Sequence, residues 1–174
     1  MVLWLGEIHL SRSLRRVLNS DRFRVTLDTA FHAVMNGCAE PRDDDAGTWI
    51  TDEMVSAYAR LAAAGYAHSV EVWEQGELVG GLYGVALGRM FYGESMFSRR
   101  ANASKVALAT LVAQLQRRGF ELIDCQMSTS HLASLGAREI PRIDFVRHVA
   151  RLAAQPALPT PWRLDENLRG RVRK

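Results

Sequence analysis

Hydrophobic and polar residues alternate, or form short apolar blocks, in five segments of the chain, and this pattern predicts five β-strands. These segments are residues 23–27, 68–73, 78–87, 90–97 and 120–126. Tight turns at 74–77 and 88–89 join the middle three segments, because glycine supplies the backbone conformations that hairpin turns need. A three-stranded antiparallel meander is therefore predicted, with one strand before it and one after it.

Apolar residues at helical spacing predict four helices, at residues 28–39, 52–64, 103–117 and 141–153. Asp28 can cap the first helix, Gly65 fits a left-handed position after the second, and Pro141 fits the first turn of the last. The resulting order, β-α-α-β-β-β-α-β-α, is characteristic of the acyl-CoA N-acetyltransferase (GNAT) fold. We therefore expect an α/β (α+β) protein with a mixed sheet flanked by helices, whose last strand runs parallel to the strand before it.

The length of 174 residues and the apolar content of 48% fit one domain with one core. We expect this domain at residues 1–155 and an extended tail, rich in Pro and Arg, at residues 156–174. The sequence has no run of about 18 apolar residues and no signal peptide. Its two cysteines, Cys38 and Cys125, are far apart. These features predict a cytoplasmic protein with reduced thiols.

Basic and acidic residues are segregated along the chain. The basic residues form two groups: Arg12, Arg15, Arg16, Arg22 and Arg24, then Arg163, Arg169, Arg171, Arg173 and Lys174. The acids gather elsewhere, at Glu40, Asp43, Asp44, Asp45, Asp52 and Glu53. This distribution suits an anionic partner such as nucleic acid. A solvent-exposed helix face and a frayed terminus would explain it equally well.

Three polar residues, Glu94, Asp124 and Gln126, interrupt strands that otherwise look buried. Burying such groups without partners costs on the order of several kcal/mol, so the fold or a substrate must satisfy them. Because side chains alternate along a strand, we expect Asp124 and Gln126 to share one face. Two alternatives stay open: the pair could cap a neighbouring loop, and Glu94 could be the buried partner of Arg99 or Arg12.

The segment before the third predicted helix argues against coenzyme A. Acetyltransferases of this fold bind pyrophosphate there through the amides of a glycine-rich loop. Residues 98–105 contain no glycine, so consecutive amides cannot easily approach a pyrophosphate. Arg99 and Lys105 could still attract some phosphate to the start of the helix.

Eight stretches of sequence, in order, resemble the leucyl/phenylalanyl-tRNA–protein transferase family. They begin with His9-Leu10-Ser11-Arg12-Ser13, Gly47-Thr48-Trp49-Ile50-Thr51, Gly65-Tyr66-Ala67-His68-Ser69-Val70-Glu71-Val72-Trp73 and Leu78-Val79-Gly80-Gly81-Leu82-Tyr83-Gly84-Val85. They continue with Gly93-Glu94-Ser95-Met96-Phe97-Ser98, Asn102-Ala103-Ser104-Lys105, Ile123-Asp124-Cys125-Gln126 and His131-Leu132-Ala133-Ser134-Leu135-Gly136-Ala137. Together they span about residues 9–147, so the resemblance is specific.

This resemblance implies roles for particular residues. Asp124, Gln126 and Glu94 look like the family's catalytic and acceptor-binding residues. The apolar residues that look like its pocket for a leucyl or phenylalanyl side chain are Leu82, Phe91, Met96, Leu108, Leu111, Leu115 and Ile123. Trp73 resembles a residue that holds the aminoacyl-adenosine end of the tRNA. Arg12, Arg15 and Arg16 would lie along the acceptor stem.

The implied reaction moves Leu, and also Phe or Met, from aminoacyl-tRNA to a protein that begins with Arg or Lys, which marks that protein for degradation. An aminoacyl ester is already activated, so no ATP, metal or nucleotide cofactor is required. Positioning of the amine can supply several kcal/mol of the barrier. Asp124 can draw the ammonium proton and the carbonyl oxygen of Gln126 can orient the amine. The histidines lack the spacing of a metal site.

Family members usually begin with a smaller domain, and the resemblance implies that this chain starts near the end of that domain. Either the sequence is truncated or this is a short variant; if the domain is absent, we expect one wall of the cleft to be missing, with apolar surface exposed around Trp4. Two other classes of function remain as alternatives. One is an acetyl-CoA-dependent N-acetyltransferase, and the other is a non-catalytic module that binds tRNA or protein N-termini. Nothing in the sequence requires more than a monomer.

Overall fold

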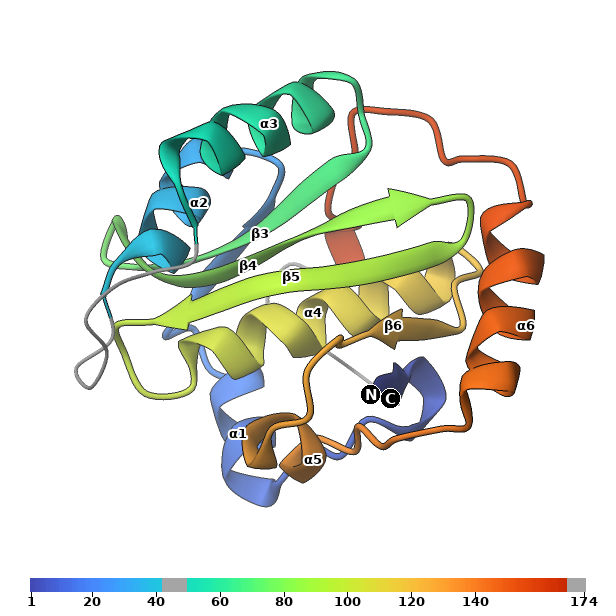
Figure 1. The fold of residues 1–174 in the computed structure, drawn as a ribbon. Coiled ribbons are helices and arrows are strands. Elements are labelled where there is room, and N and C mark those ends of the chain that lie inside the picture. The colour runs from blue at the N-terminus through green and yellow to red at the C-terminus, as the bar shows by residue number, and fades with distance from the viewer. Residues whose placement is uncertain (42–49, 169–174) are drawn as a thin grey trace.

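A computed structural model describes residues 1–41 and 50–168 and places six strands in one mixed sheet, ordered β1-β6-β5-β4-β3-β2 (Figure 1). The strands are β1 (Val2–Trp4), β2 (Arg24–Leu27), β3 (Ala67–Glu74), β4 (Glu77–Leu87), β5 (Met90–Ser98) and β6 (Leu122–Asp124). The helices are α1 (Arg12–Leu18), α2 (Phe31–Ala39), α3 (Asp52–Ala63), α4 (Ala103–Arg117), α5 (Ser130–Ser134) and α6 (Arg142–Ala153). Short 3-10 helices lie at Leu5–Glu7 and Glu166–Leu168.

The predicted meander and crossover are both present. Strands β3, β4 and β5 pair antiparallel, and α4 then leads to β6, which pairs parallel to β5. The prediction of a GNAT-like mixed sheet flanked by helices is confirmed. Gly65 has the left-handed conformation predicted after α3, with φ of +80°. Strand β6 is shorter than predicted and ends at Asp124.

The two faces of the sheet are covered differently. On one face, α4 packs its apolar side chains against β3, β4 and β5 to form the main core. On the other face, α2 and α3 cover one end through a cluster around Tyr83 and Phe97. Helix α6 covers the opposite end through a cluster around Met90 and Leu122. Figure 1 shows α3 and α6 at opposite ends of the sheet.

The sequence pattern missed β1, α1 and α5. Strand β1 and helix α5 are too short, at 3 and 5 residues, to show a hydrophobic period. Helix α1 buries Leu14 and Leu18, while Ser11 caps it by accepting a hydrogen bond from the Leu14 N–H. Strand β1 pairs antiparallel with β6 and so lies at the edge of the sheet.

Two expectations about particular residues are wrong. Asp28 does not cap α2: its backbone is left-handed, and its carboxylate accepts hydrogen bonds from Ser69 N–H at 2.8 Å and from His68 Nδ1 at 2.7 Å. Trp4 does not form an exposed apolar surface, because its ring is partly buried against the edge of His148 and under Arg138.

The C-terminal segment packs on the body of the domain. Residues 156–165 have no regular secondary structure, yet Trp162 is buried and stacks on His68 with ring centroids 3.6 Å apart. Asp165 pairs with Arg118 at 2.7 Å, and Leu164 and Leu168 join the main core. This part of the predicted tail therefore belongs to the folded unit.

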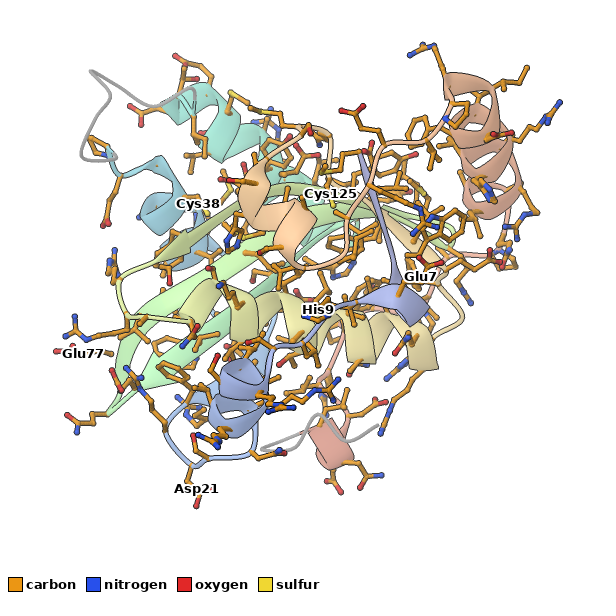
Figure 2. The ribbon with its side chains drawn as sticks, turned by 90° about the horizontal axis from the view of Figure 1, so that it is seen from below. Glu7, His9, Asp21, Cys38, Glu77 and Cys125 are labelled. Atoms are coloured by element: carbon orange, nitrogen blue, oxygen red, sulfur yellow. The ribbon has the colours of Figure 1, made fainter. Side chains whose placement is uncertain are left out.

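The two cysteines lie on separate elements, Cys38 on α2 and Cys125 just after β6 (Figure 2). Burial, with a smaller contribution from the charge of Asp124, raises the pKa of Cys125 to about 11. The thiol is therefore protonated near neutral pH and a poor nucleophile. Among residues 1–41 and 50–168, no helix is both long and apolar enough to cross a membrane.

Candidate active site

The polar residues singled out in the sequence lie where β5 and β6 separate. Strand β5 pairs with β4 along most of its length, but with β6 over just Phe91↔Ile123 and Tyr92↔Asp124. Beyond this point β6 ends and β5 continues to Ser98. The backbone of β5 after Tyr92 consequently has no strand partner on that side among the described residues.

Glu94 is the extra residue of a β-bulge. Gly93 faces Gly84 and Ser95 faces Tyr83 across the strands, so Glu94 has no opposite residue on β4. A Cβ atom on Gly84 would lie 2.2 Å from the Tyr92 carbonyl oxygen, so the close approach of the strands here requires glycine. The bulge re-aims the Glu94 side chain toward α3.

Two tyrosines lie beside Glu94. Burial raises the pKa of Tyr58, on α3, to about 12, and a hydrogen bond with Glu94 adds to the shift. Burial also raises the pKa of Tyr83, whose ring meets that of Tyr58 edge-on at 5.2 Å. The alternative that Glu94 pairs with Arg99 is wrong, because Arg99 bonds Glu40 and the Leu78 carbonyl.

Asp124 lies on the same face as Glu94, partly exposed at the end of β6. Its Oδ1 accepts a hydrogen bond from the Gln126 backbone N–H at 2.8 Å. The expectation that Asp124 and Gln126 share a strand face is wrong. Gln126 follows the end of the strand with φ of +58°, so strand alternation does not apply, and its side chain is exposed. Gln126 therefore holds Asp124 through its backbone.

Tyr92 is a neighbour of Asp124 that the sequence did not reveal. The two residues are in register across the parallel β5–β6 pair, so their side chains emerge on the same face. Burial and the negative charge of Asp124 raise the pKa of Tyr92. This proximity can be predicted only from the register of β5 against β6, and hydrophobic periodicity does not determine that register.

The predicted pocket residues lie on the opposite face, on α4 or on the strands that it covers. Six of them are at most 3% exposed and form part of the main core: Leu82, Phe91, Leu108, Leu111, Leu115 and Ile123. Met96 is the exception, since it is half-buried on β5 beyond the residues that pair with β6. In this conformation Met96 is thus the one member of the set that a ligand could reach readily.

Trp73 lies away from Asp124. It is on β3 opposite Leu78, toward the end of the sheet where Ser98 ends β5. Its indole N–H donates to Thr26 Oγ1 at 2.8 Å, and Arg24 lies over the ring at 5.4 Å. The structure therefore does not bring Trp73 together with Glu94 and Asp124.

A second polar cluster surrounds Glu71 on β3. Its carboxylate is fully buried and accepts hydrogen bonds from three hydroxyl groups, those of Thr26 and Ser69 at 2.5 Å and Thr29 at 2.7 Å. The Thr29 N–H also points to it at 3.4 Å. No sequence pattern singles out Glu71, although it lies within one of the quoted stretches.

The glycine-free loop before α4 leaves few amides for an anion. Asn102 takes the left-handed conformation, with φ of +72°. The Ala103 N–H bonds the Arg100 carbonyl at 3.0 Å, and the Ser104 N–H bonds Ser98 Oγ at 3.3 Å. Two amides of the first turn are consequently engaged by the chain itself, which disfavours a pyrophosphate there.

The three arginines predicted to bind tRNA lie on α1, and all are exposed. Arg15 donates to the Leu10 carbonyl at 3.0 Å, while no ion pair to an acid occurs for Arg12, Arg15 or Arg16 among residues 1–41 and 50–168. The acids Asp43, Asp44 and Asp45, the motif residues Gly47, Thr48 and Trp49, and the basic residues Arg169, Arg171, Arg173 and Lys174 lie outside the described residues.

Comparisons with known proteins point to one family. The model of a family described as leucyl/phenylalanyl-tRNA protein transferase matches residues 2–150. A protein of that name from Thiobacillus denitrificans is 58% identical over 165 residues, covering 95% of this chain and 72% of the relative. Another of that name, from Azotobacter vinelandii, is 62% identical over 144 residues, covering 83% of this chain and 64% of the relative.

One solved structure supports the fold alone. The structure titled L-PGS from Bacillus licheniformis superposes with a TM-score of 0.51 at 8% identity, covering 87% of this chain and 51% of that chain. The sequence matches are much stronger evidence, because they extend over most of the chain at more than 50% identity. This chain belongs to the leucyl/phenylalanyl-tRNA protein transferase family.

Proposed function

We propose that this chain transfers a leucyl group, and also phenylalanyl or methionyl groups, from tRNA to the N-terminal amine of proteins that begin with Arg or Lys. The observation that carries the proposal is the pair of carboxylates, Asp124 and Glu94, on one face of the sheet where β5 and β6 separate. Neither forms an ion pair with a basic side chain among residues 1–41 and 50–168. The N-terminal ammonium group of an acceptor protein can pair with these two carboxylates.

The acceptor nitrogen attacks the ester carbonyl carbon, an amide bond forms, and the bond to the ribose oxygen breaks. The acceptor ammonium group loses two protons as it becomes an amide: the one still on the attacking amine ends on the ribose hydroxyl of the released tRNA, and the one that leaves first goes to solvent. Asp124 draws that proton from the ammonium group, and Gln126 holds the Asp124 carboxylate through its N–H. Glu94, fixed by Tyr58, orients the amine from the other side.

The donor would approach from the unpaired side of β5. We propose that the apolar amino acid enters beside Met96 and reaches the predicted pocket when side chains beneath α4 move. Selection would rest on apolar fit, where one methylene is worth only about 1–3 kcal/mol, so Phe and Met should also react. The arginines of α1 would contact the acceptor stem, and a terminal adenosine directed toward Ser98 would approach Trp73.

Because aminoacyl-tRNA is a cytoplasmic donor, we place the reaction in the cytoplasm and propose that its products are marked for degradation. We propose a monomer as the active species. Engagement of the first-turn amides of α4 argues against the acetyl-CoA alternative.

The direct test is incubation of the protein with radiolabelled leucyl-tRNA and a peptide that begins with Arg. We expect label in the peptide, no label when the peptide is N-acetylated, and no rise in melting temperature with acetyl-CoA. Binding of both substrates without product would favour the non-catalytic module. A rise in melting temperature with acetyl-CoA, together with acetylation of the peptide, would refute the proposal.

A further inference from the structure

A strip of the sheet carries the candidate site between its two covered ends. Helices α2 and α3 cover the end around Phe97, and α6 covers the end around Met90. Between them, Tyr92, Glu94 and Asp124 are partly exposed. This strip is bounded by apolar packing on both sides and bears acidic and hydroxyl groups.

Tyr92 and Asp124 lie close enough to contact one small cation. Tyr92 and Asp124 are in register on adjacent strands, which are spaced about 4.8 Å apart. Glu94 follows Tyr92 by two residues on the same strand, at the bulge, and its side chain turns toward α3. A guanidinium or ammonium group beside Tyr92 can donate to the Asp124 carboxylate and to the lone pairs of the hydroxyl group.

The Tyr92 hydroxyl is available for such a contact. Within the described part of the chain it forms no hydrogen bond. It is also absent from the set of buried polar atoms without a partner, so its oxygen is accessible to solvent. Its ring packs partly against the cluster beneath α6, which fixes where the hydroxyl group points. The rise in its pKa by burial and by Asp124 places the hydroxyl within the field of that carboxylate.

We propose that Tyr92 is a further specificity-determining residue, whose hydroxyl group, beside Asp124, contacts the cationic side chain of the acceptor's first residue while Asp124 and Glu94 bind that residue's amine. This inference rests on the proposed function, because it assigns part of the same acceptor site. Arg should bind better than Lys, since its planar guanidinium can bond two acceptors at once. The phenol ring adds a favourable face for either cation.

The test measures binding of the acceptor alone, without tRNA. Two labelled peptides that differ in their first residue, Arg or its neutral isostere citrulline, are titrated into the wild-type chain, Tyr92→Phe and Tyr66→Phe. Tyr66 is an exposed tyrosine before β3 and serves as the matched control. Phe keeps the ring of Tyr92 and its packing, and the melting temperature of each variant verifies the fold.

We expect Tyr92→Phe to raise the Kd of the Arg peptide about tenfold and to leave that of the citrulline peptide unchanged. Tyr66→Phe should match wild type for both. Equal Kd values for Tyr92→Phe and wild type would overturn the inference, as would equal weakening of both peptides or no preference of wild type for Arg. Wild-type chain that prefers Arg but transfers no leucine would refute the proposed function and leave the role of Tyr92 intact.

Discussion

Two acids on the same face of the sheet have very different surroundings. Glu71 on β3 is fully buried, and hydroxyl and amide groups of the chain itself occupy its carboxylate. Asp124 at the end of β6 is partly exposed, and its one intramolecular hydrogen bond within the described residues comes from the Gln126 N–H. A carboxylate has about four acceptor positions, so Glu71 is satisfied and Asp124 is not.

This difference separates an acid that stabilises the fold from one that is available to a substrate. A buried carboxylate without hydrogen bonds would cost several kcal/mol, and the donors around Glu71 offset that cost. Asp124 remains partly in water and retains acceptor capacity. The comparison therefore predicts opposite consequences when each acid is replaced by its amide.

The largest effect should follow from Asp124→Asn. The variant keeps an oxygen for the Gln126 N–H but removes the charge that draws the acceptor proton. Leucyl transfer should fall by about 100- to 1000-fold, a change of about 3–4 kcal/mol in barrier. Initial rates at saturating leucyl-tRNA measure this loss, and the melting temperature should stay within about 2 °C of wild type. Transfer at the wild-type rate would remove Asp124 from the mechanism.

Glu71→Gln should show the reverse behaviour. The amide NH₂ would face hydroxyl donors, leaving buried groups unsatisfied at a cost of about 2 kcal/mol in the free energy of unfolding. The melting temperature should fall by about 4–8 °C. Transfer per folded molecule should change less than about twofold. A strong loss of transfer without loss of stability would make Glu71 part of the site and break the comparison.

The sequence alone predicted much of this arrangement, and its errors have physical causes. Long segments such as β4 and α4 bury one face over many residues, so their period is clear. Glu94 and Asp124 were found because acids stand out in apolar strands. Glu71 was overlooked, since its satisfaction depends on Thr26 and Thr29, which lie more than 40 positions away in sequence.

Two further features depend on local backbone geometry that no hydrophobic pattern encodes. Gln126 was expected beside Asp124, but its left-handed φ ends the strand alternation. Tyr92 was not selected, because its place next to Asp124 follows from the register of two strands separated by a helix. The family resemblance could supply roles for residues, but it could not supply these positions.

The contrast between occupied and available charges extends to the arginines. Arg138 and Arg151 pair with Glu7 and Glu121, whereas Arg12 and Arg16 have no such acid within residues 1–41 and 50–168. The double variant Arg12→Ala/Arg16→Ala should raise the KM for leucyl-tRNA about tenfold. It should also reduce the slope of log KM against the logarithm of the salt concentration by about 1–2, which is about one unit for each lost phosphate contact.

Steady-state kinetics at several salt concentrations measure this change. The matched control is Arg142→Ala/Arg147→Ala on α6, which removes the same charge from another exposed helix. The control should leave the salt dependence as in wild type. Equal effects of the two double variants would indicate a general attraction to RNA and no defined contact along α1.

The smallest effects should come from the two tyrosines beside Glu94, which differ as the two acids do. The Tyr58 hydroxyl lies beside Glu94, which helps to raise its pKa, while the Tyr83 hydroxyl is buried without a partner among the described residues. Tyr58→Phe should therefore lower kcat/KM for the acceptor peptide about fivefold, because Glu94 loses the group that fixes it.

Tyr83→Phe should instead leave transfer unchanged and raise the free energy of unfolding by about 1 kcal/mol, since a buried hydroxyl without a hydrogen bond is removed while the packed ring is kept. Chemical denaturation of both variants, measured beside their acceptor kinetics, distinguishes the two outcomes. A loss of transfer in Tyr83→Phe would show that its hydroxyl group serves the reaction. A buried group without an intramolecular partner would then belong to the site, and burial would no longer distinguish groups that stabilise the fold from groups that contact the substrate.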